Sequence, residues 1–94
     1  MSSDDEVVKK GILEYVGKLL EYKIEHFYDC GLEPFKKYNF ISSEAMKIVN
    51  NANRKFRDHL PSMYTLHYYF VEQIFGTTKS EDLPEDLPQL VITW

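Results

Sequence analysis

Apolar residues recur every three or four positions between residues 4 and 29, and this periodicity limits the possible folds more than any other feature of the chain. At 100° per residue these positions fall on one side of a helix, opposite charged residues such as Lys10, Glu14 and Lys18. The apolar side comprises Val8, Ile12, Tyr15, Val16, Leu19, Leu20, Ile24 and Phe27. Its arc of roughly 200° is wider than a single packing partner requires, so we expect contact with two neighbours, or with one neighbour and a partner.

Both ends of this first helix carry recognisable signals, so we expect it to run from about residue 4 to residue 29. Ser3 begins a capping box with the acidic residue three positions later, and Gly31 follows the last periodic residue, as a helix-ending glycine does. Gly11 and Gly17 lie in the helix interior, where each costs about 1 kcal/mol relative to alanine. They either allow a close backbone approach or are simply tolerated.

A second helix is expected from about Ser43 to His59, where one of two serines serves as N-cap and Pro61 prevents continuation. Its apolar stripe comprises Ala45, Ile48, Val49, Ala52, Phe56 and Leu60. Residues 31–42 are expected to form a connection in which Pro34 opens no more than a short helical turn. This segment is too rich in Phe, Tyr and Ile for a free loop, so we expect it to fold back over the core.

A third helix is expected from about Ser62 to Phe75, followed by Gly76, with a β-strand as the competing interpretation of its Tyr and Val content. One stripe, with the spacing of a buried helix face, comprises Met63, Leu66, Phe70 and Ile74. A second stripe runs beside it and comprises Tyr64, Tyr68, Val71 and Phe75. A small domain has one core to offer, so we expect this second, aromatic stripe to bind a partner.

The composition changes after residue 76, where Glu81-Asp82-Leu83-Pro84 is repeated at once as Glu85-Asp86-Leu87-Pro88. Two prolines four positions apart do not fit inside one regular helix. The sequence therefore predicts an all-α fold, with a three-helix domain over residues 1–76 and an extended acidic tail over residues 77–94. Such a tail either packs as an extended strap on its own domain, stays disordered, or serves as a recognition peptide. In the last case the expected partner-binding residues also include Leu83, Leu87 and Trp94.

Few features point to chemistry. His26 and Cys30 have an i, i+4 spacing that would place two ligands on one helix face, and His59 and His67 would be needed to complete a metal site. No paired ligand motif and no Gly-rich phosphate loop is present, and a Cys–His hydrolase needs a positioned base and an oxyanion site. We therefore expect no catalytic residue, no metal and no cofactor.

Nucleic acid is the alternative partner. Lys47, Asn50, Arg54 and Arg57 form one exposed stripe on the second helix, and these residue types contact phosphates and bases. Residues 31–60 carry six Lys or Arg against three acidic residues, although the whole chain has a net charge of −4. The third helix, which would follow a tight turn as a recognition helix does, carries no Lys or Arg.

The expected function is non-enzymatic: binding to another protein, or to a second copy in a homodimer, as an adaptor, inhibitor or regulatory subunit. Cys30 is the only cysteine, no apolar run approaches the roughly 18 residues of a membrane span, and the first residues are acidic. We therefore expect a cytoplasmic protein without membrane association.

Overall fold

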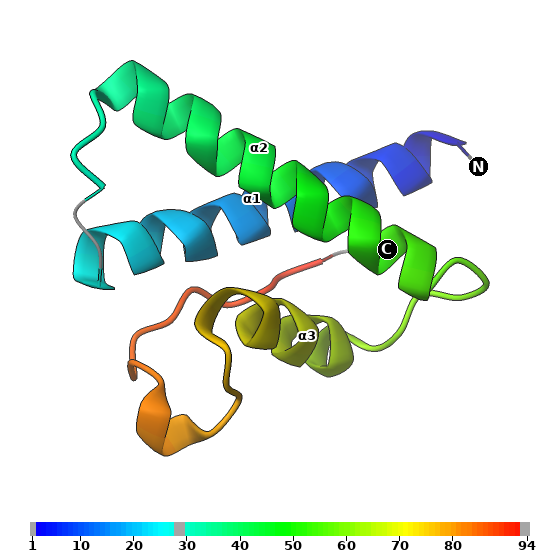
Figure 1. Cartoon of the computed structure of the whole chain (residues 1–94). Helices are drawn as coiled ribbons and strands as arrows, with labels where there is room; N and C mark the ends of the chain where they lie inside the picture. The colour runs from blue at the N-terminus through cyan, green and yellow to red at the C-terminus, as the bar shows by residue number, and fades with distance from the viewer. Residues whose placement is uncertain (1, 28–29, 93–94) are drawn as a thin grey trace.

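Three helices and a short 3-10 turn make up the computed structural model, which describes residues 2–27 and 30–92, with side chains from residue 5 onward. In chain order they are α1 (Ser2–Phe27), α2 (Pro34–Lys55), α3 (Met63–Phe75) and the 3-10 turn η1 (Ser80–Asp82) (Figure 1). No strand occurs in the described ranges. The predicted all-α fold of three helices is thus confirmed.

Helix α1 packs against both other helices, as its wide apolar arc predicts. Seven of the eight predicted core residues in α1 are buried, and Val16 and Leu19 are fully inaccessible. The exception is Phe27, which is 53% exposed in the last turn and meets the ring of Phe75 edge to face at 5.9 Å. The proposed capping box at Ser3 lies outside the described side chains.

Helix α2 begins earlier and ends earlier than the sequence patterns indicate. It starts at Pro34, with Glu33 as the N-cap residue, and ends at Lys55. The predicted connection over residues 31–42 is therefore wrong from Pro34 onward, because Pro34 sits in the first helical turn, where its missing N–H costs nothing. The predicted serine N-cap lies inside the helix, since burial of Ala45 and Val49 outweighs the weak helix propensity of serine.

Helix α3 agrees closely with its predicted bounds. The Ser62 Oγ accepts a hydrogen bond from the backbone N–H of Thr65 at 3.3 Å, which caps the first turn. Gly76 ends the helix in the left-handed conformation, with φ of 77°. The ammonium group of Lys23 on α1 donates to the carbonyl oxygen of Ile74, which joins the end of α3 to α1.

The tail leaves α3, passes through η1 and returns toward α1 and α3 (Figure 1). Leu90 is buried and belongs to the same core cluster as the three helices, and both leucines of the acidic repeat pack against that cluster. The hydroxyl of Tyr22 on α1 donates a hydrogen bond to the Asp86 carboxylate. The tail is therefore held to the helices by an apolar contact and a polar one.

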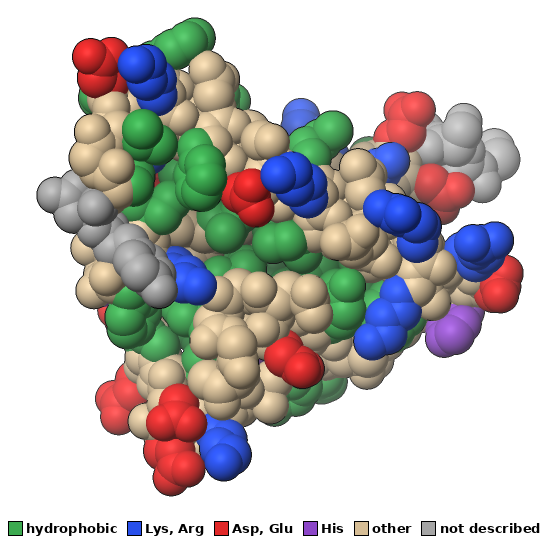
Figure 2. Space-filling view, in the orientation of Figure 1, with side chains coloured by type: hydrophobic (Ala, Val, Ile, Leu, Met, Phe, Trp, Pro, Cys, Tyr) green, Lys and Arg blue, Asp and Glu red, His purple; other side chains and the backbone are tan. Residues whose placement is uncertain are grey.

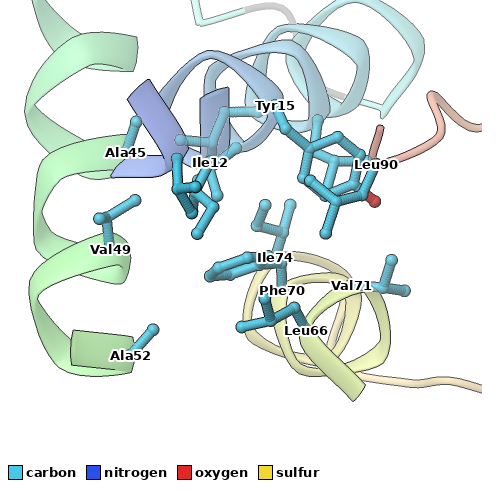
Figure 3. Packing of buried hydrophobic residues seen from close by; sticks show 14 residues of the cluster. Ile12, Tyr15, Ala45, Val49, Ala52, Leu66, Phe70, Val71, Ile74 and Leu90 are labelled. Carbon is cyan, nitrogen blue, oxygen red and sulfur yellow. The ribbon is translucent and has the colours of Figure 1, made fainter. Parts of the chain in front are cut away.

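The core is formed where α1, α3, one face of α2 and the tail meet (Figure 3). Helix α2 contributes mainly small side chains to it, Ala45, Val49 and Ala52, whereas α3 contributes Phe70 and Leu66. The small side chains let α2 pack against α1 where the two helices cross (Figure 1). Among the helices of the described ranges, none combines the length and apolar character needed to cross a membrane.

Candidate functional site

A hollow of about 680 Å³ lies between α1 and the first half of α2, and we call it the α1–α2 groove. Its lining comes from these two helices only, so α3 and the tail do not cover it. From α1 the groove is lined by Leu13, Glu14, Gly17, Lys18 and Glu21, and from α2 by Pro34, Lys37, Tyr38, Ile41, Ser42, Ala45 and Met46.

The groove is hollow because small residues line its floor. Gly17 of α1 and Ser42 and Ala45 of α2 are among the lining residues, and none of these three fills the space between the helices. Leu13 and Ile41 are half-buried and pack against the core, so they give the floor an apolar character without closing it. The result is a trough with a width set by two helices and a floor of small and apolar residues.

Large apolar side chains are exposed beside the groove, along one side of α2. Phe35 is 74% exposed, Tyr38 69% and Met46 51%, and their spacing places them within about 80° of one another on the helix. Figure 2 shows hydrophobic side chains reaching the surface over the start of α2, at the upper left. On soluble proteins, exposed apolar patches of this kind usually mark sites where another molecule binds.

The two rims of the groove differ in charge. The α1 rim carries the exposed side chains of Glu14, Lys18 and Glu21, which alternate in sign. On the α2 side the charged residue is Lys37, which is half-buried and lies 3.7 Å from the Glu25 carboxylate. A ligand in the groove would thus meet alternating charges on one side and aromatic and thioether surface on the other.

The predicted aromatic stripe of α3 is divided by the structure. Tyr64 is 74% exposed and Tyr68 53%, so both are accessible to a partner. Val71 is fully buried in the core, and Phe75 is half-buried against Phe27. Accessible aromatic surface on α3 is therefore confined to its first two turns, and its binding role stays a prediction.

The predicted binding residues of the tail lie close to the core. Leu83 and Leu87 are half-buried, with their side chains packed on the helices, and Trp94 lies outside the described residues. The Asp86 hydrogen bond raises the pKa of the Tyr22 hydroxyl to about 12, and the same bond lowers the pKa of Asp86. Both shifts favour the ionised carboxylate bound to a neutral phenol, which is the form that holds the tail at neutral pH.

The predicted basic stripe is present on the outer side of α2. Its members Lys47, Asn50, Arg54 and Arg57 are all exposed. Lys47 lies 3.1 Å from Glu44, and the Arg54 guanidinium donates to the Asn51 side chain at 2.9 Å. Two of the four are thus engaged with neighbours on α2, and Arg57, just beyond the end of α2, lines a separate hollow between α1 and the end of α2.

The histidines and the cysteine are not gathered into a site. His26 stacks on Tyr22 at 3.9 Å between ring centroids, Cys30 is exposed, and His67 is hydrogen-bonded through Nδ1 to the hydroxyl of Tyr15. Within the described ranges, no three His, Cys, Asp or Glu side chains come close enough to share a metal ion. Burial raises the pKa of Tyr15 and lowers that of His67, so the Tyr15–His67 pair is neutral at physiological pH.

The lining of the α1–α2 groove escaped sequence reasoning, although the signals were present. A helix begun at Pro34 places Tyr38, Ile41 and Ala45 on one face, in the same 3.6-residue pattern that defines the later part of α2. Gly17 was a second signal, because a glycine on the apolar edge of a helix leaves open the space that a side chain would fill.

Comparison with protein-family models, with curated proteins and with solved structures found no match to this chain.

Proposed function

We propose that the chain is a non-enzymatic protein–protein interaction module that binds its partner in the α1–α2 groove. The observation that carries this proposal is the groove itself, an open apolar trough flanked by the exposed Tyr38 and Met46. A trough between two helices has the shape that receives an amphipathic helix, whose apolar side chains fill the floor. The chain would then act as an adaptor, an inhibitor or a regulatory subunit.

The hydrogen-bonded pair Tyr15 and His67 is the feature most like a catalytic pair, and its position does not suit catalysis. Polar pairing at Tyr15 and His67 joins α1 to α3 inside the molecule, and Tyr15 is only 4% exposed. A catalytic pair needs access to substrate and a site for the developing charge, and a buried phenol provides neither. We assign this pair a structural role.

Nucleic-acid binding through the basic stripe is the second candidate, favoured by four exposed side chains, three on α2 and Arg57 just beyond its end. Against it stand the acidic net charge of −4 and the absence of Lys and Arg from α3. A protein partner with an acidic surface would use the same stripe. Protein binding accounts for both the groove and the stripe, so it is the preferred function.

Site-specific photocrosslinking distinguishes the two protein-binding surfaces. A benzophenone amino acid replaces Tyr38 beside the groove, and in a matched variant it replaces Tyr68 on α3, which is exposed to a similar degree. We expect a discrete protein adduct from position 38 in native extract, and its loss when Gly17→Leu fills the groove floor. Circular dichroism of each variant establishes that the helices are intact. Adducts at position 68 only would move the binding site to α3, and none at either position would refute the proposal.

A further inference from the structure

We infer that the occupant of the α1–α2 groove is a second copy of this chain, paired antiparallel along α1 about a two-fold axis at the level of residues 15–17. This inference rests on the proposed function, because it names the partner of the same groove. It is carried by the order of charges on the groove side of α1, by the glycine at the level of the axis, and by the apolar rim of α2.

Four exposed charges follow one another along that side of α1: Lys10, Glu14, Lys18 and Glu21. Their spacings of four, four and three residues keep them on one helical stripe about 80° wide. The signs alternate, so the stripe has the opposite sign order when it is followed in the reverse direction. Within the described chain none of the four forms an ion pair, which leaves their charges available to a partner.

Antiparallel pairing of two such stripes brings opposite charges together throughout. Glu14 faces Lys18 of the second copy and Lys10 faces its Glu21, and two-fold symmetry repeats both contacts, as in an isologous interface. A shift by one helical turn in either direction places Glu14 or Lys18 opposite itself, and parallel pairing does the same for all four. The charges therefore specify one register, which is the role that such contacts have at interfaces.

Gly17 lies at the level of the proposed axis, and packing within the single chain does not require a glycine at this position. A Cβ built there meets no heavy atom within 4 Å, so internal packing would accept alanine, which is the better helix former. A second helix crossing at this level would use the missing side chain, because helices approach most closely where small residues meet. The same crossing would place Tyr38 and Met46 of α2 against α1 of the second copy and remove their exposed surface from water.

Charge exchange between two variants tests the register directly. Glu14→Lys and Lys18→Glu each turn two attractive contacts of the symmetric dimer into repulsive ones, and we expect self-association of either variant to weaken by about tenfold or more. In an equimolar mixture both contacts between positions 14 and 18 are again attractive, one with its original signs and one with the signs exchanged, so a heterodimer should form with an affinity near that of the unmodified protein. Native mass spectrometry resolves the heterodimer by mass, and sedimentation equilibrium gives the affinities.

Matched controls carry the same charge changes away from the groove. Glu72→Lys on α3 and Lys79→Glu after it alter exposed residues, and we expect neither to change the oligomeric state or to produce heterodimers on mixing. Gly17→Leu should give a monomer whose helices remain intact by circular dichroism. A dimer that survives both charge variants and Gly17→Leu would place the interface elsewhere and overturn the inference.

Oligomeric state and crosslinking at position 38 together separate the dimer from binding to a different protein. A chain that stays monomeric from about 1 to 200 µM has no second copy in the groove at the micromolar affinities typical of weak specific dimers. If such a monomer still crosslinks another protein through position 38, the groove is a docking site for a different partner and only the inference is refuted. If it crosslinks nothing, both proposals fall.

Discussion

Replacing Gly11 with alanine should stabilise the protein. Gly11 lies inside α1, and a Cβ built on it meets nothing within 4 Å, so the added methyl group enters open space. Glycine in a helix interior is about 1 kcal/mol less favourable than alanine, chiefly because it has more backbone freedom to lose on folding. We therefore expect Gly11→Ala to raise the free energy of unfolding by about 1 kcal/mol.

The same substitution at Gly76 should have the opposite effect. Gly76 ends α3 with φ of 77°, and its N–H donates to the Glu72 carbonyl at 2.9 Å. A residue with a Cβ costs roughly 1–2 kcal/mol in this left-handed conformation, so Gly76→Ala should lower stability by about that amount. The two variants have the same change in composition and differ only in backbone conformation.

Thermal unfolding in dilute solution, followed by far-ultraviolet circular dichroism, measures both effects. For a domain of this size, 1 kcal/mol shifts the Tm by about 4–8 °C. We expect Gly11→Ala to raise the Tm by about 5 °C and Gly76→Ala to lower it by at least as much. A fall in Tm for Gly11→Ala would show that this part of α1 is covered in the folded molecule, which would refute the packing described here.

Three further predictions test the core, the pH dependence and the basic stripe. Phe70→Ala should lower the free energy of unfolding, measured with urea, by about 3–5 kcal/mol because Phe70 is fully buried. Tyr68→Ala, at a site that is 53% exposed, should lower it by less than about 1 kcal/mol. Equal losses of stability in the two variants would make Tyr68 a core residue. Burial lowers the pKa of His67, so the folded state resists protonation of this imidazole. The free energy of unfolding should therefore be unaffected by His67 above about pH 6.5, the pKa of an unfolded histidine, and should decrease as the pH falls below that value. His67→Gln should therefore reduce the loss of stability between pH 8 and pH 5, and an unchanged pH profile would contradict the assignment. DNA and RNA should bind no tighter than about 10⁻⁵ M at physiological salt, and a tighter, salt-sensitive complex lost on Arg54→Ala would make nucleic-acid binding the preferred function.

Helices α1 and α3 could be predicted from the sequence because their capping residues and their apolar periodicity indicate the same helix. In α1 the apolar positions repeat with one unbroken period, and in α3 Ser62 and Gly76 mark the ends by capping chemistry that depends only on neighbouring residues. Phe27 departs from its pattern because it lies in the last turn of α1, where the neighbouring helices no longer surround it.

Helix α2 and the groove could be predicted only in part, because local signals conflict there. The serines at 42 and 43 resemble a helix start, yet the backbone passes through them as helix, since Ile41 and Ala45 gain burial on α1. The groove depends on which turn of α1 lies opposite which turn of α2. That register is set by packing between residues far apart in the chain and has no signature in either segment alone.

The position of Leu90 bears on the order in which the molecule assembles. It joins the buried cluster that contains Tyr15, so the first helix and the ninetieth residue complete one core (Figure 3). Synthesis proceeds from the N-terminus at about 5–20 residues per second, so α1 and α2 are made some seconds before Leu90. In that interval the surface later covered by Leu90 is open to water and to other chains. We therefore expect variants that weaken the packing of Leu90 to increase aggregation during synthesis.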